Sequence, residues 1–370
     1  MIPRFCTCAV RATAACSTGS RSTRRNSGAG ACPVRLDGTG ESDVHNDCVS
    51  LPVDLDTALQ PRPSSPVQEV QDERFERQGV RLLLKREDLI HATLEWDSAA
   101  LGPVDLYPPG NKWRKLAPNL RAAAESGRRT LVTFGGAYSN HLRATAAAGR
   151  LLGFASVGVV RGDELAGRPL NPSLARCAAD GMRLVFVDRA AYRRAAEPAH
   201  VAALLADAGL DPDSVYLLPE GGSNALAVTG CVDLGRELRG AAETVAVPCG
   251  TGGTLAGLAA GLDAGQRALG FPVLRGGFLD AATRDLQRAA FAAPTAAWTL
   301  DDRFHFGGFA RTSAELESFA ADFEQRHGLA VERLYVAKML YGLTTLAAEG
   351  AFAPGTAVAA VITGVPEPTA

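Results

Sequence analysis

The fold class follows from the stretch TVAVPCGTGGT, residues 244–254, in which a short apolar run leads directly into a glycine-rich turn. Two other apolar runs end in the same way, as TFGG at residues 133–136 and as PEGG at residues 219–222. In open α/β sheets, ligands bind outside the carboxyl ends of the strands, where loops of this kind lie. The three glycine loops are therefore where we expect a binding site.

Short apolar runs alternate with Ala- and Leu-rich segments of helical length along the rest of the chain. The expected strands are residues 81–85, 130–134, 156–160, 183–187, 215–218, 244–248 and 357–362. The expected helices are residues 113–126, 140–152, 174–180, 190–208, 224–238, 254–262, 313–326 and 337–348. Gly127, Gly153 and Gly181 follow helices where a left-handed residue is wanted. This alternation predicts an α/β protein with open, twisted, mostly parallel sheets and helices on both faces.

Composition excludes several function classes. The 370 residues suggest about two domains. The net charge of −2 provides no basic excess to neutralise phosphates, so we expect no nucleic-acid partner. No apolar run approaches the roughly 20 residues that cross a bilayer, so no membrane span is predicted. No cysteine pair after residue 60 has C-x-x-C spacing, and we expect no metal.

The two ends of the chain differ from its body. Up to Leu36 there are six arginines and no acidic residue, which is typical of a transit peptide. A disordered tail, or a start codon placed too far upstream, are two other interpretations of residues 1–60. A Pro-containing tail, residues 366–370, ends the chain. We expect a cytoplasmic protein, with mitochondria as the alternative in a eukaryote.

Lysine chemistry has four candidates, because the chain contains only Lys85, Lys112, Lys115 and Lys338. Lys112 follows Gly-Asn at the junction between a loop and a helix. The helix N-terminus disfavours an ammonium group there, and a Schiff base requires a neutral amine. A solvated lysine at a helix start remains the alternative for this local pattern.

The other two segments are suited to anions. Ser139 or Asn140 is the expected N-cap after TFGG, and backbone N–H groups at such a junction bind carboxylates. The loop 250–254 can wrap a phosphate with its backbone N–H groups and hydroxyls. An ordinary cap and a plain tight turn are the respective alternatives. Together the three segments suggest pyridoxal 5′-phosphate and a small amino acid.

Six motifs in order then resemble the 1-aminocyclopropane-1-carboxylate deaminase/D-cysteine desulfhydrase family over about residues 65–364. They are KREDLIH at 85–91, GNKWRKL at 110–116, FGGAYSNH at 134–141, PEGGSN at 219–224, FHFGGFA at 304–310 and LYVAKMLYG at 334–342. The resemblance implies a two-domain, tryptophan-synthase-β-like fold and a homodimer. Residues 61–114 with 224–365 would form the large cofactor-binding domain, and residues 115–223 the small α/β domain.

The resemblance also implies roles for individual residues. Lys112 matches the Schiff-base lysine, and Asn140 matches the asparagine that contacts the pyridine hydroxyl. Ser139 matches a serine that holds the substrate carboxylate or carries a proton, and Tyr335 an active-site tyrosine. The remaining matches are the phosphate loop Gly250, Thr251, Gly252, Gly253 and Thr254, the ring-nitrogen partner Thr363, and the substrate-pocket residues His141 and Phe309.

Departures from the family pattern guide the choice of reaction. Relatives that open the cyclopropane ring carry a glutamate after the active-site tyrosine, whereas this chain has Val336. Phe309 stands where the family has a tyrosine, residues 362–365 depart from His-Thr-Gly-Gly, and residues 93–109 form an extra loop. Thr363 is the remaining partner for the ring nitrogen, and its neutral hydroxyl favours an unprotonated ring.

We therefore expect a D-cysteine desulfhydrase-like β-elimination that gives a 2-oxo acid and ammonia. The alternatives are 1-aminocyclopropane-1-carboxylate deamination, a catalytically weak protein that binds pyridoxal phosphate, and an unrelated serine hydrolase that uses Ser139 and His141.

Overall fold

The computed structural model describes residues 65–90, 110–293, 298–364 and 366, which all belong to one compact unit of the chain. The predictions for residues 1–60 and 93–109 lie outside these residues, as does most of the tail 366–370. The division into two domains stays a prediction, because no boundary separates the described residues.

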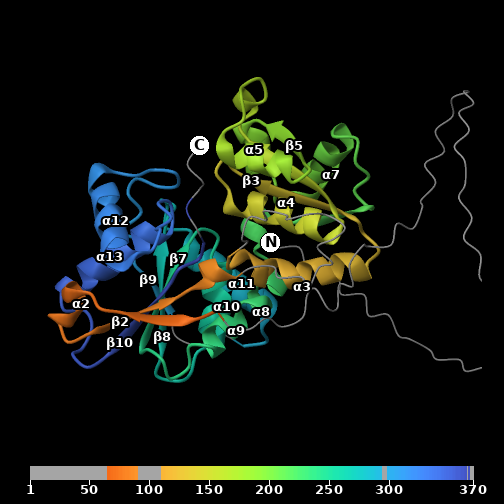
Figure 1. Cartoon of the computed structure of the whole chain (residues 1–370). Coiled ribbons are helices and arrows are strands. Elements are labelled where there is room, and N and C mark those ends of the chain that lie inside the picture. Colours follow the sequence, from red (N-terminus) through yellow and green to blue (C-terminus); the bar gives the residue numbers. More distant parts are fainter. Residues whose placement is uncertain (1–64, 91–109, 294–297, 365, 367–370) are drawn as a thin grey trace, which may run out of the picture. The chain divides into compact units, whose positions relative to one another are not determined.

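The larger sheet has six strands in the order β1-β2-β10-β7-β8-β9 (Figure 1). Its strands are β1 (Val67–Val70), β2 (Arg81–Lys85), β7 (Thr244–Cys249), β8 (Arg267–Pro272), β9 (Trp298–Leu300) and β10 (Ala357–Val361). All neighbours are parallel except the antiparallel pair β1–β2. At the centre, Ala360 lies opposite Leu84 of β2 and Ala246 of β7.

The smaller sheet has four parallel strands in the order β5-β4-β3-β6. Its strands are β3 (Thr130–Gly135), β4 (Ala155–Arg161), β5 (Met182–Val187) and β6 (Val215–Leu218). Because all four strands point the same way, the loops after them share one edge of the sheet.

Helices cover both faces of the larger sheet, as its largely apolar strands require. One face packs against α2 (Glu73–Glu76), α12 (Ala314–His327) and α13 (Val336–Ala348), with Phe323 and Leu343 in the core. The other face packs against α9 (Val232–Arg236), α10 (Gly253–Gly261) and α11 (Leu279–Ala290). The short helix α8 (Ala225–Gly230) packs against α3, α10 and α11.

The smaller sheet is covered in the same way. On one face lie α3 (Lys112–Glu125), α4 (Asn140–Leu152) and α5 (Pro172–Ala179). On the other lie α6 (Arg189–Arg193) and α7 (Pro198–Asp207). Three 3₁₀ turns complete the elements: η1 (Glu87–Leu89), η2 (Asp163–Leu165) and η3 (Glu220–Gly222). The predicted α/β class with mostly parallel sheets is confirmed.

Two predicted helices were wrong in extent. The helix expected over 190–208 is two helices, because Pro198 starts α7 and Glu197 before it is extended. The helix expected over 224–238 breaks at Cys231, directly after Gly230, a residue with low helix propensity. Strands β1, β8 and β9 and helices α2 and α11 were not predicted at all. The glycines expected to end helices do so, with φ of +72°, +74° and +84° at Gly127, Gly153 and Gly181.

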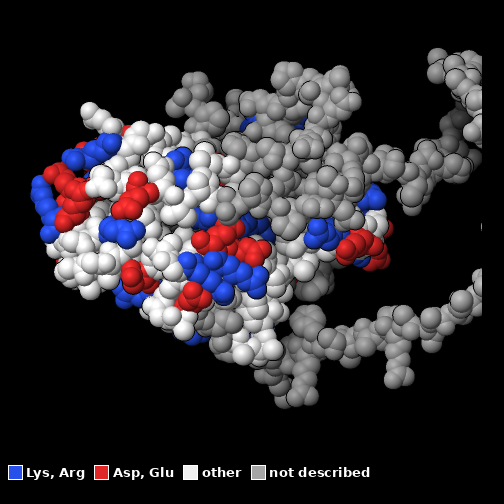
Figure 2. Space-filling view, turned by 60° about the horizontal axis from the view of Figure 1, so that its bottom comes forward, with Lys and Arg blue, Asp and Glu red and all other residues white. Residues whose placement is uncertain are grey.

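Charged side chains of both signs are intermixed over the described part of the face drawn in Figure 2. Among the described residues, no helix combines the length and the apolar character that a membrane span requires.

Candidate active site

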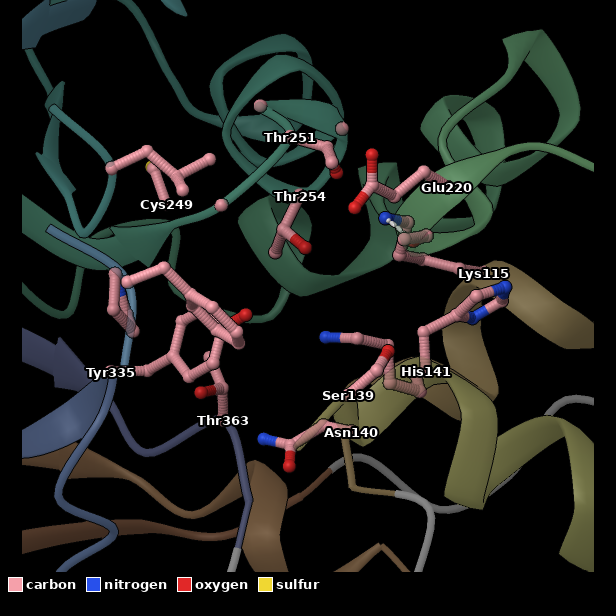
Figure 3. Close-up of a pocket in the computed structure, with 18 of the residues that line it drawn as sticks. Lys115, Ser139, Asn140, His141, Glu220, Cys249, Thr251, Thr254, Tyr335 and Thr363 are labelled. Atoms are coloured by element: carbon pink, nitrogen blue, oxygen red, sulfur yellow. Dashed lines mark hydrogen bonds between the residues drawn. The ribbon is translucent and has the colours of Figure 1, made fainter. Parts of the chain in front are cut away.

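A pocket of about 350 Å³ lies where the glycine loops after β3, β6 and β7 meet the first turns of α3 and α13. Every site residue predicted from the sequence lines this one pocket: Lys112, Ser139, Asn140, His141, Gly250, Thr251, Gly252, Gly253, Thr254, Phe309, Tyr335 and Thr363. Figure 3 labels seven of them, Ser139, Asn140, His141, Thr251, Thr254, Tyr335 and Thr363. Residues more than 200 positions apart therefore come together, because the carboxyl ends of parallel strands share an edge.

Lys112 is the first residue of α3, and the strand end after β10 fixes its position. The Asn111 backbone N–H donates to the Thr363 carbonyl oxygen at 3.1 Å. A Cβ on Gly110 would lie 2.5 Å from the same oxygen, so only glycine allows this approach. The Lys112 Nζ donates to Asn111 Oδ1 at 3.2 Å, and Asn111 Nδ2 donates to Thr254 Oγ1 at 3.2 Å. These bonds tie the lysine to the phosphate-loop candidate.

Burial lowers the pKa of Lys112 below its usual 10.5, and the charge of Arg143 adds to this effect. The negative charge of Glu332 opposes the shift. Burial and the neighbouring Lys112 also lower the pKa of Lys115, to about 7. A larger neutral fraction near pH 7 is what a lysine needs to attack a carbonyl group.

A buried cluster of ion pairs anchors the first turn of α3 through Arg114. Arg114 bonds Glu87 at 2.6 Å and Glu237 at 2.8 Å, and Lys85 bonds Glu237 at 2.6 Å. Glu87 is fully buried and Lys85 is 1% exposed, so removing either partner would leave a buried charge unpaired. Residues 85–90 of the KREDLIH motif therefore hold α3 in place, and none of them lines the pocket, while His91 lies outside the described residues.

The loop between β7 and α10 forms a cradle in which Thr251 is flanked by glycines on both sides. A Cβ on Gly252, whose φ is +82°, would lie 2.4 Å from Thr283 Oγ1, and one on Gly253 would lie 2.6 Å from Ser223 Oγ. Ser223 Oγ is 2.5 Å from Thr251 Oγ1 and accepts from Lys115 Nζ at 2.6 Å. The N-terminus of α10, the hydroxyl-bearing Thr251 and Thr254, and Lys115 all line the pocket, and this set suits a phosphate.

Ser139 is the N-cap of α4, as predicted, and its Oγ accepts from the Leu142 N–H at 3.3 Å. The Asn140 Oδ1 accepts from Arg143. Figure 3 places Ser139 and Asn140 across the pocket from Tyr335 and Thr363. An N-cap serine at a helix start can bind a carboxylate together with nearby backbone N–H groups.

His141 lines the pocket but has little to offer a substrate. Its ring is 2% exposed, and its Nε2 lies 2.8 Å from Thr133 Oγ1. Thr133 donates its own proton to the Leu218 carbonyl oxygen at 3.1 Å, so it accepts from Nε2–H. The remaining Nδ1 is buried without a partner, and burial keeps the pKa of His141 well below 6.5. His141 is therefore neutral, and it does not pair with Ser139 as a hydrolase would require.

Tyr335 and Phe309 form the opposite wall, with ring centroids 5.8 Å apart in an edge-on arrangement. Tyr335 caps α13, and the buried Glu332 accepts from its N–H at 2.7 Å. Lys338, fully buried on α13, donates to the carbonyl oxygens of His305 at 3.0 Å and Gly308 at 2.9 Å. These bonds hold the loop before Phe309.

Thr363 and Val336, the two positions considered for contact with the ring nitrogen, lie in different surroundings. Thr363 lines the pocket, whereas Val336 is fully buried in the apolar core on α13. Of these two residues, only Thr363 can therefore present a polar group to the ring nitrogen of a bound cofactor, since Val336 replaces the family's glutamate and lies in the core.

Some lining residues were not predicted as site residues. They are Asn111, Lys115, Gly136, Arg161, Glu220, Gly221, Pro248, Cys249, Leu255, Leu274 and Phe278. Arg161 ends β4 and Glu220 follows β6, and their place at carboxyl ends of strands was the available signal. Cys249 is not a nucleophile candidate, since burial raises its pKa to about 12.

An α/β fold with a buried lysine beside an anion cradle defines a site for a phosphate-bearing cofactor with an aldehyde group. The sequence profile described as "Pyridoxal-phosphate dependent enzyme" matches residues 109–364, and this chain belongs to that family. Pyridoxal phosphate, predicted from the sequence, is confirmed as the cofactor at the level of the family. The glycine cradle, and Lys112 with its pKa lowered by burial, fit it.

The relatives agree with the narrower resemblance. A "Putative 1-aminocyclopropane-1-carboxylate deaminase" of Thermotoga maritima is 31% identical over 213 residues, 56% of this chain and 61% of that protein. A "D-cysteine desulfhydrase" of Yersinia pestis is 33% identical over 198 residues, 50% of this chain and 53% of that protein. The chain thus spans little more than half the length of these relatives.

Solved structures confirm the tryptophan-synthase-β-like fold class. A crystal structure described as an ACC deaminase homologue superposes with a TM-score of 0.66 at 24% identity, covering 82% of this chain and 90% of that one. A fungal L-serine ammonia-lyase from Rhizomucor miehei gives a TM-score of 0.53 at 15% identity, over 82% of this chain and 94% of that one. At these identities the likeness concerns the fold alone.

Proposed function

We propose that this protein is a pyridoxal-phosphate-dependent lyase that eliminates the β-substituent of a small amino acid, as a D-cysteine desulfhydrase does. The products would be a 2-oxo acid and ammonia. The observation that carries the proposal is the meeting, in one pocket, of Lys112 with the 250–254 cradle and with Ser139. The named relatives support the substrate class.

The chain's residues divide the binding of the cofactor. Lys112 would carry its aldehyde carbon, and residues 250–254 with Lys115 would hold its phosphate. Asn140 would contact the ring hydroxyl, and Thr363 would face the ring nitrogen. When bound, the cofactor withdraws electrons from the α-carbon of the substrate.

The remaining residues act on the substrate. Ser139 Oγ and the N-terminus of α4 would hold its α-carboxylate, or Ser139 Oγ would relay a proton. Tyr335, whose pKa is raised above 10 by burial and by Glu332, keeps its hydroxyl proton and can donate it. Lys112 Nζ can accept a proton because burial favours its neutral form.

The choice of β-elimination rests on what faces the ring nitrogen. Thr363 is neutral, and Val336 is in the core, so no carboxylate at that position holds a proton on the ring. A weaker electron sink suffices for removing an acidic α-proton and expelling a thiol, whereas opening a cyclopropane ring demands more. Phe309 lacks the hydroxyl of the family's tyrosine, and losing one proton donor typically costs about 10²–10⁴-fold in rate.

The experiment is a substrate panel with the cofactor-loaded protein. We expect sulfide and a 2-oxo acid from D-cysteine. Steady 2-oxobutanoate from 1-aminocyclopropane-1-carboxylate, without sulfide from D-cysteine, would overturn the choice of reaction. Changes in the cofactor's absorbance without any product would favour the second candidate, a catalytically weak pyridoxal-phosphate-binding protein. The observation behind that candidate is the Phe309 ring, which stands against Tyr335 where the family has a hydroxyl.

We also propose a homodimer in the cytoplasm. The family resemblance supports the dimer. Size-exclusion chromatography with light scattering measures the mass directly, and a value near the 38.6 kDa of one chain would contradict the dimer.

A further inference from the structure

One wall of the pocket carries a cation that the proposed mechanism does not use. Arg161 is the last residue of β4, next to β3 in the smaller sheet. A Cβ on Gly136 would lie 3.4 Å from an Arg161 guanidinium nitrogen and 3.8 Å from the Phe309 ring. The bare backbone of Gly136 therefore lies between a cationic wall and an aromatic wall.

The guanidinium of Arg161 is held in place but not neutralised. It lies over the Tyr192 ring, 5.4 Å from the centroid, and Tyr192 itself is only 6% exposed. Stacking of this kind orients an arginine and leaves its N–H groups free to bind. Among the described residues, the contact of the Arg161 guanidinium is the one with the Tyr192 ring, and no hydrogen bond or ion pair is formed with any of them.

The other two basic side chains of the pocket already have partners. Lys112 bonds Asn111, and Lys115 bonds Ser223 and the Gly221 carbonyl oxygen. The nearest acidic residue of the lining is Glu220, whose charge raises the pKa of Tyr192 after the larger effect of burial. Glu220 and Arg161 thus flank Tyr192 without forming an ion pair.

We propose that Arg161 recognises a negative charge on the β-substituent of the substrate. This inference rests on the proposed function and names the substrate class more narrowly. That class is small amino acids whose β-substituent is a thiolate, sulfinate or sulfonate. A planar, permanently charged guanidinium binds sulfinate and sulfonate oxygens, or the carboxylate oxygens of a non-reacting analogue, with two parallel hydrogen bonds.

The same contact assists the elimination step. The bond between Cβ and the substituent breaks, and its electron pair leaves with the substituent. The α-proton passes to a base such as Lys112 Nζ, so charge and atoms balance. For a thiol substrate, Arg161, whose side chain is exposed at the end of β4, would stabilise the thiolate as it forms.

The test compares two ligands that differ only in charge. The binding of aspartate and asparagine to the cofactor-loaded protein, in both enantiomers, is measured by isothermal titration calorimetry. The protein should bind aspartate about 10-fold more tightly than asparagine, as one charge-assisted contact allows. Arg161→Gln should abolish this preference, and Arg161→Lys should restore part of it.

Arg189→Gln provides the matched control. Arg189 lies on α6, which packs against the same sheet, pairs with Glu164 at 2.8 Å, and does not line the pocket. The Arg189→Gln substitution removes the same net charge as Arg161→Gln but away from the pocket, so the preference for aspartate should persist in this variant. Loss of the preference in both variants would indicate a long-range field and overturn the specific role of Arg161.

Two outcomes separate this inference from the proposed function. If D-cysteine still yields sulfide, but Arg161→Gln leaves the preference for aspartate unchanged, then only the inference is overturned. If no amino acid binds and none is turned over, the proposed function fails and the inference fails with it. A selective fall in kcat/KM for the sulfonate analogue of cysteine in Arg161→Gln, with S-methylcysteine unaffected, would support the inference.

Discussion

At the scale of single residues, the four lysines differ in what holds them. Lys85 is bound to Glu237, Lys338 to two carbonyl oxygens, and Lys115 to Ser223 and Gly221. Lys112 has one weak amide partner at 3.2 Å, from Asn111. Lys112, at the loop–helix junction, is therefore the lysine whose amine is held by the weakest contacts and is most available to bind a cofactor.

Ser139 should serve both stability and turnover. Ser139→Ala removes the N-cap of α4 and should cost about 1 kcal/mol of unfolding free energy. It should also lower turnover by roughly 10²–10⁴-fold, because a proton-carrying or carboxylate-binding hydroxyl is lost. Urea unfolding and steady-state kinetics measure the two effects.

Ser313→Ala is the matched control for that change. Ser313 caps α12 in the same way, accepting from the Leu316 N–H at 3.2 Å, but it does not line the pocket. It should lose similar stability and keep its turnover. Equal losses of turnover in the two variants would mean that Ser139 acts only as a cap.

Lys338 should make stability depend on pH in a defined window. Burial lowers its pKa from 10.5 to about 8. Between pH 8 and 10.5 the unfolded chain binds more protons than the folded chain, so this lysine makes stability rise with pH. Relative to Lys338→Met, the wild-type unfolding free energy should increase by about 1–2 kcal/mol from pH 7.5 to 9.5. An unchanged difference in urea unfolding at the two pH values would contradict the burial of a titrating amine.

At the scale of elements, the units of strand, glycine loop and helix position the residues that line the pocket. The loop 250–252 connects β7 to α10, and its conformation depends on Gly252. A side chain there meets two obstacles, a positive φ and the Thr283 hydroxyl. The cradle is therefore a property of the element junction and not of one side chain.

Gly252→Ala should weaken cofactor binding by about 10-fold or more, as the loop shifts to relieve the contact. Gly181→Ala is the control, since Gly181 has φ +84° and nothing within 4 Å of its added Cβ. Both variants should lose about 1–2 kcal/mol of stability from the strained backbone. Titration of each cofactor-free protein with pyridoxal phosphate, followed by absorbance, should show weaker binding for Gly252→Ala alone.

Most of the site was predictable from the sequence because its residues lie in contiguous motifs at strand ends. Arg161 and Glu220 were missed as site residues because only the strand order β5-β4-β3-β6 brings their strand ends beside β3. His141 lines the pocket as predicted, but the motif does not show which way its ring faces. It follows Ser139 and Asn140 in sequence, but each helical residue turns by about 100°, and its ring faces Thr133 of β3.

The elements divide in a similar way. Buried central strands such as β7 and β10 are continuous apolar runs, and these were predicted. β1 is a four-residue edge strand with two adjacent polar residues at its centre, and β8 contains an arginine, a glycine and a proline. Pairing with neighbouring strands makes both of them strands, and pairing is not a local property of the sequence.

At the scale of the whole molecule, surface charge contributes little. Ion pairs such as Arg284–Asp280 and Arg236–Asp233 lie between exposed side chains. Figure 2 shows charges of both signs intermixed on the described part of one face. Pairs of this kind are worth about 0–1 kcal/mol each. Stability rests on the two apolar layers around the larger sheet and the layers around the smaller one.

A chain starting at Leu51 should keep both its cofactor occupancy and its thermal stability. The described body begins with Ser65, which is buried and bonded to Glu87, and the described residues that line the pocket all lie after residue 110. Scanning calorimetry and cofactor absorbance on the full and shortened chains measure the two properties. A fall in melting temperature of more than a few degrees would show that the first 50 residues contribute to the fold.

The most direct test of the account is the identity of the lysine that carries the cofactor. Borohydride reduction makes the attachment of pyridoxal phosphate to its lysine permanent, and peptide mass mapping then locates the label. The account predicts the label on Lys112, with none on Lys85, Lys115 or Lys338. A label on any of those three lysines, or no label on a protein saturated with the cofactor, would contradict it.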